Sequence, residues 1–262
     1  MSNGIAALTT ARFEVDDGVG RLILNRPERL NSITNRMVVE VHDALAEISG
    51  RSDVRVLILT GAGRGFCPGA DLKHFAAGES DLATRPEHFR IALYLHRMPQ
   101  VTLAAINGAC AGAGFAWASA CDLRVAARSA TFNTAFLNVA SAGDMAGPWT
   151  LPRIVGAARA RELYFLPDKF DAERALDIGL VSRVFDENEF AGQVEAIARR
   201  LAAASPHALR TMKRNFIDAE TTDLETYLQI ETERHLQVMA HADAQEAFRA
   251  FVEKRPPRFG GT

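Results

Sequence analysis

Two glycine-rich segments of the sequence have the composition of turns that hold a negatively charged group. Residues 61–72 (GAGRGFCPGADL) follow an apolar run, and residues 107–114 (NGACAGAG) follow a second one. Glycine lets the backbone approach a ligand closely, and the free N–H groups at the start of a helix stabilise negative charge. If both turns faced one pocket, they would form an oxyanion hole, in which loss of one donor typically costs about 2.7–4 kcal/mol of transition-state stabilisation.

Several familiar catalytic motifs are absent from the sequence. Gly61, Gly63 and Gly65 do not fit GxGxxG, and there is no GxxxxGK[ST], GxSxG or HExxH. These absences argue against dinucleotide-binding, P-loop, α/β-hydrolase and zinc-protease sites, and we predict no metal site. Cys67 lies inside the first glycine-rich segment, but no base accompanies it in the sequence, so we expect packing and not nucleophilic attack.

Alternating strands and helices must position the two glycine-rich turns. The apolar runs at 54–60 and 101–106 are typical of strands buried on both faces of a sheet. A hairpin turning at Asp17-Gly18 precedes them, and a helix capped by Thr34 lies between the hairpin and the first run. The pattern predicts an α/β fold with a mainly parallel sheet.

The chain becomes helical from about residue 157. We expect a helix capped by Ser205 with Pro206 at its first position, then helices over 223–239 and 243–253, the last opened by an Asp-x-x-Glu box. Because no linker separates this part from the rest, we predict a packed appendage and not an independent domain.

The composition bounds the class of protein. The 262 residues carry a net charge of −2, which leaves no basic excess for a nucleic-acid phosphate backbone. Three cysteines without a CxxC pair, and no secretory pattern in residues 1–10, favour a reducing compartment such as the cytoplasm. Residues 98–121 carry no charge and resemble a membrane span, but Pro99 and Asn107 favour a buried strand followed by a packed helix, so we predict no membrane span.

Several ordered motifs together resemble the crotonase superfamily, the enoyl-CoA hydratase/isomerase family. They are NRPE at 25–28, GFCPGADL at 65–72, INGACAGAG at 106–114, ACDL at 120–123 and LPRIVG at 151–156. The resemblance implies a spiral of repeated ββα units over residues 1–200 and a C-terminal helical trimerisation region over 201–262. It further implies acyl-CoA thioester substrates, a homotrimer or a dimer of trimers, and no cofactor other than the coenzyme A of the substrate.

The resemblance also implies where the substrate is held. The backbone N–H groups of Ala70 and Ala113 would stabilise a thioester enolate, and Asp71 would cap the helix that follows. The residues expected to contact the substrate or its coenzyme A are Arg26, Glu28, Leu30, Pro68, Gly69, Asp71, Leu72, Lys73, Gly112, Phe136, Trp149, Lys254 and Arg255.

The sequence departs from the hydratase pattern at both catalytic glutamates, whose positions are Ala116 and Phe136 here. Hydration needs one group to activate water and one to protonate carbon, whereas double-bond migration needs a single base. Asp144, in the segment SAGDMAG, matches the place where isomerase members carry one acidic residue, and an apolar pocket would raise its pKa.

An enoyl-CoA isomerase is therefore the favoured function. A hydratase or acyl-CoA hydrolase in which Asp144 activates water is the first alternative. A non-catalytic member that binds acyl-CoA or a protein partner is the second, and a purely structural Asp144, in a turn or cap, stays open.

Overall fold

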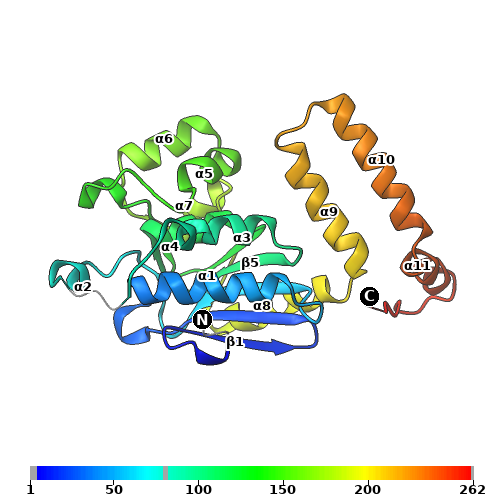
Figure 1. Cartoon of the computed structure of the whole chain (residues 1–262), viewed down its shortest axis with the longest axis horizontal. Coiled ribbons are helices and arrows are strands. Elements are labelled where there is room, and N and C mark those ends of the chain that lie inside the picture. The colour runs from blue at the N-terminus through cyan, green and yellow to red at the C-terminus, as the bar shows by residue number, and fades with distance from the viewer. Residues whose placement is uncertain (1–4, 79–81, 261–262) are drawn as a thin grey trace.

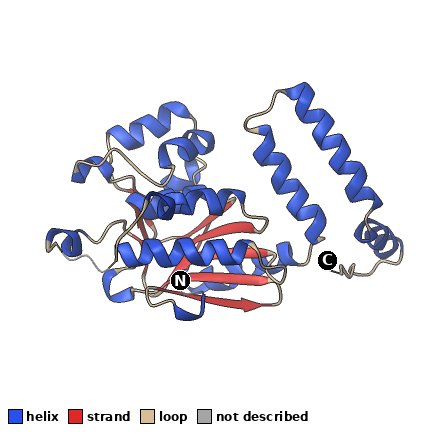
Figure 2. Ribbon diagram, in the orientation of Figure 1, coloured by secondary structure: helices blue, strands red, loops and turns tan. Residues whose placement is uncertain are grey.

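The computed structural model describes residues 5–78 and 82–260, so the first four residues of the segment inspected for a secretory signal lie outside the described part. Two sheets form the body of the molecule (Figure 2). The larger has the order β1-β2-β3-β5-β7-β10 and is parallel except for the β1–β2 hairpin. Its strands are β1 Ala11–Asp16, β2 Val19–Leu24, β3 Val56–Gly61, β5 Val101–Ile106, β7 Leu123–Ala127 and β10 Arg183–Phe185.

The second sheet is smaller than the first. Its order is β4-β6-β8-β9, and its strands are β4 Gly65–Cys67, β6 Ala109–Ala111, β8 Thr131–Asn133 and β9 Phe170–Asp171. Each of β3, β5 and β7 is followed in the chain by one of these short strands, and α4 (Gly112–Ala120) completes the central unit. This is the predicted spiral of ββα units. Residues 65–67 and 109–111 were predicted as turn, and they form strands, because strands of three residues carry no periodicity.

Helices cover both faces of the larger sheet. On one face, α1 (Asn35–Ser49), α3 (Ile91–Arg97) and α4 enclose the main hydrophobic core; on the other, α8 (Glu187–Ala202) closes a smaller core against β2, β3, β5 and β7. Short helices complete this body: α2 Leu72–Ala76, α5 Gly147–Val155, α6 Ala157–Phe165 and α7 Ala172–Asp177, with 3-10 turns η1 Ile5–Ala7, η2 Pro27–Arg29, η3 Pro86–Arg90 and η4 Phe136–Val139.

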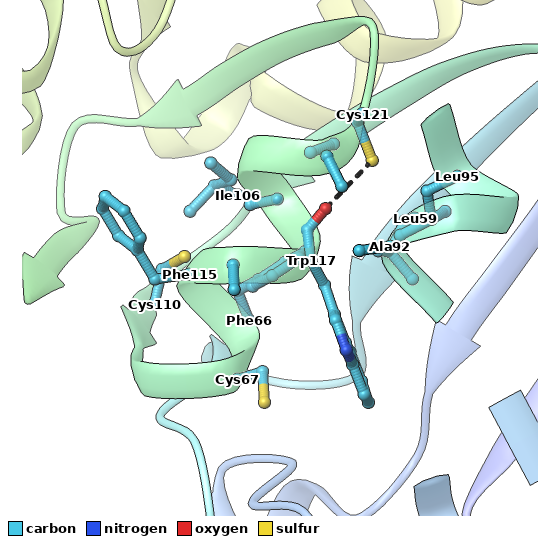
Figure 3. Close-up of a cluster of buried hydrophobic side chains, with 14 of the residues drawn as sticks. Leu59, Phe66, Cys67, Ala92, Leu95, Ile106, Cys110, Phe115, Trp117 and Cys121 are labelled. Carbon is cyan, nitrogen blue, oxygen red and sulfur yellow. Dashed lines mark hydrogen bonds between the residues drawn. The ribbon is translucent and has the colours of Figure 1, made fainter. Parts of the chain in front are cut away.

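The hydrophobic core holds α4 in place. The second glycine-rich segment ends in the first turn of this helix. Every residue of α4 is buried, and Trp117 and Phe115 are among the largest fully buried side chains. Figure 3 shows them packed among side chains of the sheet and α3, with Cys67 and Cys110 close by. Burial raises the pKa of the Cys67 thiol to about 12, so it is a packing residue, as predicted.

Three C-terminal helices project from the body (Figure 1). They are α9 (Pro206–Ala219), α10 (Leu224–Ala240) and α11 (Ala242–Val252). Ser205 caps α9 as predicted, but α11 is capped by His241, and Asp243 instead accepts a hydrogen bond from Ser205 (2.6 Å). The buried Lys213 of α9 joins them to the body through Asp122 (2.8 Å). Across the described residues, no helix is long and apolar enough to cross a membrane.

Candidate active site

The two glycine-rich turns meet at the amino-terminal end of α4. Gly69 has a φ of +93°, which favours glycine. A Cβ on Gly69 would lie 3.1 Å from the Ala111 carbonyl oxygen and 3.4 Å from the Gly112 Cα. The backbones at residues 69 and 112 are therefore in contact, and the residues that follow them, Ala70 and Ala113, are neighbours.

The N–H groups of Ala70 and Ala113 are both available to a ligand. The Gly69 carbonyl accepts a hydrogen bond from the Ile33 N–H (2.8 Å), so in a trans peptide the Ala70 N–H points away from residue 33. Ala113 is the second residue of α4, where an N–H has no acceptor within the helix. Among the described hydrogen bonds neither N–H has an acceptor. The pair therefore has the donors that an oxyanion hole needs, at the positive end of a helix dipole.

Two asparagines hold the first glycine-rich turn in shape. The side-chain amide of Asn31 donates to the Gly65 carbonyl (2.8 Å), and that of Asn107 donates to the carbonyls of Gly61 (2.9 Å) and Gly63 (2.8 Å). Sequence reasoning gave neither residue a role in the site. The available signal was Asn107 at the start of the second segment, because such side chains satisfy loop carbonyls, whereas Asn31 lies 30 residues before the turn that it holds.

An ion pair ties the same turn to the loop after β2. The Arg26 guanidinium lies 2.9 Å from the Asp71 carboxylate, which also caps α2 by accepting from the His74 N–H (3.2 Å). Burial alone would raise the pKa of Asp71, but these hydrogen bonds bring it below its usual value. Asp71 caps α2 as predicted. The charge of Arg26 is paired within the chain, and its predicted contact with the substrate stays a prediction.

Asp144 stands in a turn that keeps its carboxylate out of the backbone hydrogen bonds. Gly143, Met145 and Ala146 have φ values of +98°, +48° and +60°, and strained backbone of this kind clusters at functional sites. The N-cap of α5 is Ala146, so Asp144 caps no helix. Its Oδ1 is buried and has no hydrogen-bond partner among the described atoms. Burial raises the pKa of Asp144, since nothing compensates for lost hydration.

Asp144 lies close to the two positions where the hydratase glutamates are missing. Its carbonyl accepts from the Gly147 N–H (3.1 Å), and a Cβ on Gly147 would lie 3.4 Å from the Cβ of Ala116, one turn after Ala113 on α4. Phe136 stacks on Tyr164, with ring centroids 5.9 Å apart, and the charge of Asp144 acts on Tyr164. The structure thus brings Asp144, Ala116 and Phe136 around one point beside the first turn of α4.

Most of the other predicted contact residues surround the oxyanion pair. Gly69 and Gly112 directly precede the two donor residues. Leu30 packs on the first turn, where its Cβ would lie 3.1 Å from a Cβ added to Gly65. On the outer side of the turn, the exposed residues available to coenzyme A are Glu28, Leu72 and Lys73, with Pro68 half-buried beside them.

Three predicted contact residues lie elsewhere in the chain. Lys254 and Arg255 follow α11, at the opposite end of the molecule from α2 (Figure 1), and Arg255 is paired with Glu246 (2.5 Å). Trp149 stacks under Arg153 and lines a groove of about 480 Å³ between α4, α5 and α9, to which no other predicted site residue contributes. Within one chain these three residues therefore lie apart from the other predicted contact residues, because Trp149 lines the groove beside α9 and the other two follow α11.

Comparison with known proteins agrees with this geometry. Residues 14–262 match the family model described as "Enoyl-CoA hydratase/isomerase". The chain belongs to the enoyl-CoA hydratase/isomerase family. It is an acyl-CoA-processing member of the crotonase superfamily.

Relatives within the family carry different names. The chain is 38% identical to the 1,2-epoxyphenylacetyl-CoA isomerase of Escherichia coli K12, over 94% of this chain and 97% of the relative. It is 33% identical to 4-chlorobenzoyl coenzyme A dehalogenase-1 of Arthrobacter sp., over 92% and 90%. A crystal structure of enoyl-CoA hydratase from Bacillus anthracis superposes with a TM-score of 0.89 at 31% identity, covering 97% of this chain and all of that one. Family membership thus fixes the fold and the thioester class, while the reaction must be argued from the side chains.

Proposed function

We propose that this protein is an enoyl-CoA isomerase that moves a double bond with a single carboxylate. The observation that carries the proposal is the Asp144 carboxylate, which is partly buried and has an unpartnered Oδ1 within the described structure. It lies beside Ala116 and Phe136, neither of which can transfer a proton. Hydration by the two-glutamate route would need both positions to be acidic.

The chemistry assigns a separate task to each group. The Asp144 carboxylate removes a proton from the carbon next to the thioester carbonyl of a 3-enoyl-CoA. The C–H electron pair enters the enolate system, and negative charge develops on the thioester oxygen. The N–H groups of Ala70 and Ala113 stabilise that oxygen. Asp144 then returns its proton to the γ-carbon and the 2-enoyl-CoA forms, so the carboxylate ends as it began. A raised pKa suits this cycle because the same group must accept and donate.

Coenzyme A enters only as part of the substrate in this mechanism. The exposed Lys73 and the backbone of residues 68–72 would hold it along the outer side of the oxyanion turn. No resident cofactor or metal takes part in any step.

We also propose that the chain acts as a homotrimer or a dimer of trimers. In a single chain the C-terminal helices expose a set of large apolar side chains to water, and apolar patches of this kind mark protein interfaces. They are Met212, Phe216, Leu224, Leu228, Leu236, Met239, Phe248, Phe251 and Val252.

A panel of thioesters tests the proposed reaction. Matched 2-enoyl- and 3-enoyl-CoA substrates are incubated with the parent enzyme, with Asp144→Asn and with Asp53→Asn, a control at an exposed aspartate paired to Arg51. We expect double-bond migration by the parent and the control, and a loss of at least about 100-fold in Asp144→Asn, the usual scale for a general acid–base group. Water addition to the 2-enoyl thioester without migration would instead support the hydratase alternative.

A further inference from the structure

Tyr164 of α6 presents its hydroxyl at the point where α4 and α5 meet. A Cβ on Gly147 would lie 1.9 Å from the Tyr164 Oη and 3.4 Å from the Ala116 Cβ, so only glycine at 147 admits the phenol. The ring is stacked on Phe136 at an interplanar angle of 5°. Packing on two sides therefore fixes the direction of the hydroxyl, toward the place that a glutamate at 116 would otherwise fill.

This hydroxyl is buried and has no hydrogen-bond partner among the described atoms. Asp144 Oδ1, whose charge acts on the same phenol, is in the same state. Buried polar groups are almost always hydrogen-bonded, and an unpaired one is costly. Two unpaired groups close enough for the charge of one to act on the other point to a ligand that satisfies them.

The two groups differ in what they can do. Burial and the neighbouring Asp144 raise the pKa of Tyr164, so the phenol keeps its proton and serves as a hydrogen-bond donor. Asp144 as a carboxylate can take a proton from carbon. A donor needs an acceptor, and a plain hydrocarbon chain has none. An unsubstituted acyl group would leave the hydroxyl both buried and unpaired.

We propose that the Tyr164 hydroxyl donates a hydrogen bond to an oxygen atom carried by the acyl chain, so that the substrates are oxygenated acyl-CoA thioesters. The oxygen is a hydroxyl, oxo or epoxide oxygen within a few carbons of the thioester. This assignment rests on the proposed function for the acyl-CoA site, but not on which reaction Asp144 performs. A site built to hydrogen-bond a substrate oxygen discriminates strongly against the analogue that lacks it.

Binding of unreactive thioesters tests this without relying on turnover. Calorimetry compares hexanoyl-CoA with its 3-, 4- and 5-hydroxy derivatives on the parent, on Tyr164→Phe and on Tyr227→Phe. Tyr227 is a matched control, because its hydroxyl is bonded to Glu231 (2.9 Å) on α10. We expect the parent to bind one hydroxy derivative about 10-fold tighter than hexanoyl-CoA. Tyr164→Phe should bind both equally and hexanoyl-CoA as well as the parent does, while Tyr227→Phe keeps the preference.

Two outcomes would overturn the proposal. One is a parent enzyme that prefers none of the three hydroxy derivatives, and the other is a Tyr164→Phe variant that keeps the preference. Gly147→Ala provides a second variant, since its methyl group displaces the hydroxyl, and it should also lose the preference. If Asp144→Asn failed to lower isomerisation while these binding results held, the reaction assignment would fall and the Tyr164 contact would stand.

Discussion

Replacing Asp144 with asparagine should stabilise the protein, whereas the same change at Asp71 should destabilise it. Burial raises the pKa of Asp144 in the folded state and leaves Oδ1 unpaired, so its ionised form works against folding. An amide of the same shape costs less to remove from water. An unsatisfied buried polar group costs about 1–3 kcal/mol, and for this half-buried carboxylate we expect a gain near the lower limit, about 1 kcal/mol.

The effect of Asp144 has a defined dependence on pH. Below the unfolded-state pKa, about 3.9, the carboxyl is protonated in both states and costs nothing. As the pH rises from there through the raised folded-state pKa, the folded state binds more protons than the unfolded one, so stability falls. The advantage of Asp144→Asn should therefore be near zero at about pH 4 and full at pH 8.

Asp71 gives the opposite sign. Its folded-state pKa is lowered by Arg26 and the His74 N–H despite burial, so it contributes stability above about pH 4 that is lost only as the pH falls through that lowered value. Hydrogen bonds to a charged group are worth about 1.5–3 kcal/mol, and Asp71→Asn should lose that amount at pH 8.

Differential scanning calorimetry at one protein concentration, from pH 4 to 8, checks both aspartates. At pH 8 the melting temperature should rise by about 2–4 °C in Asp144→Asn, the shift that 1 kcal/mol causes in a chain of this size, and fall by several degrees in Asp71→Asn. A fall in both variants would refute the reasoning, because it would mean that Asp144 has a stabilising partner.

Three further changes test the framework around the site. Arg26→Ala should lower the melting temperature and weaken acyl-CoA binding in calorimetry, since Asp71 loses its partner. Unchanged binding would mean that the Arg26–Asp71 ion pair does not support the substrate site. Lys213→Ala should cost about 1–3 kcal/mol in urea unfolding, because it removes the cation beside the Asp122 carboxylate and the donor to the Gln100 carbonyl; an unchanged free energy of unfolding would contradict that. Phe251→Glu, on the most exposed of the large apolar side chains (85%), should yield a smaller species in light scattering; an unchanged mass would remove this face from the interface.

The meeting of the two glycine-rich turns was within reach of the sequence because its signals are local, whereas the choice of Ala70 and Ala113 came from the family resemblance. A buried strand, a glycine-rich turn and a helix start occur twice in succession, and parallel strands bring such turns to one edge of a sheet. The structure indeed places Gly69 against Gly112. The β1–β2 hairpin and α1 were predictable for the same reason, since the positive φ values at Asp17 and Gly18 and the Thr34 cap follow from residue type.

Tyr164 was out of reach because its role depends on packing between distant segments. A single tyrosine on a helix has no distinctive spacing, and its hydroxyl reaches the site only because Gly147 lacks a side chain. The partners of Arg26 and Arg255 were out of reach of the sequence for a related reason. A basic residue in a sequence shows its charge but not its partner, and both arginines are neutralised by carboxylates of their own chain.

Exchange of substrate carbon-bound hydrogen tests the central claim most directly. A 3-enoyl-CoA is incubated in D₂O with the parent enzyme or with Asp144→Asn, and deuterium at the α- and γ-carbons is followed by NMR. A single carboxylate that carries the proton from the α-carbon to the γ-carbon predicts double-bond migration by the parent with less than one deuterium incorporated per turnover, and a migration rate lower by at least about 100-fold in the variant. Migration at the same rate in both enzymes would contradict the assignment of Asp144 as the base.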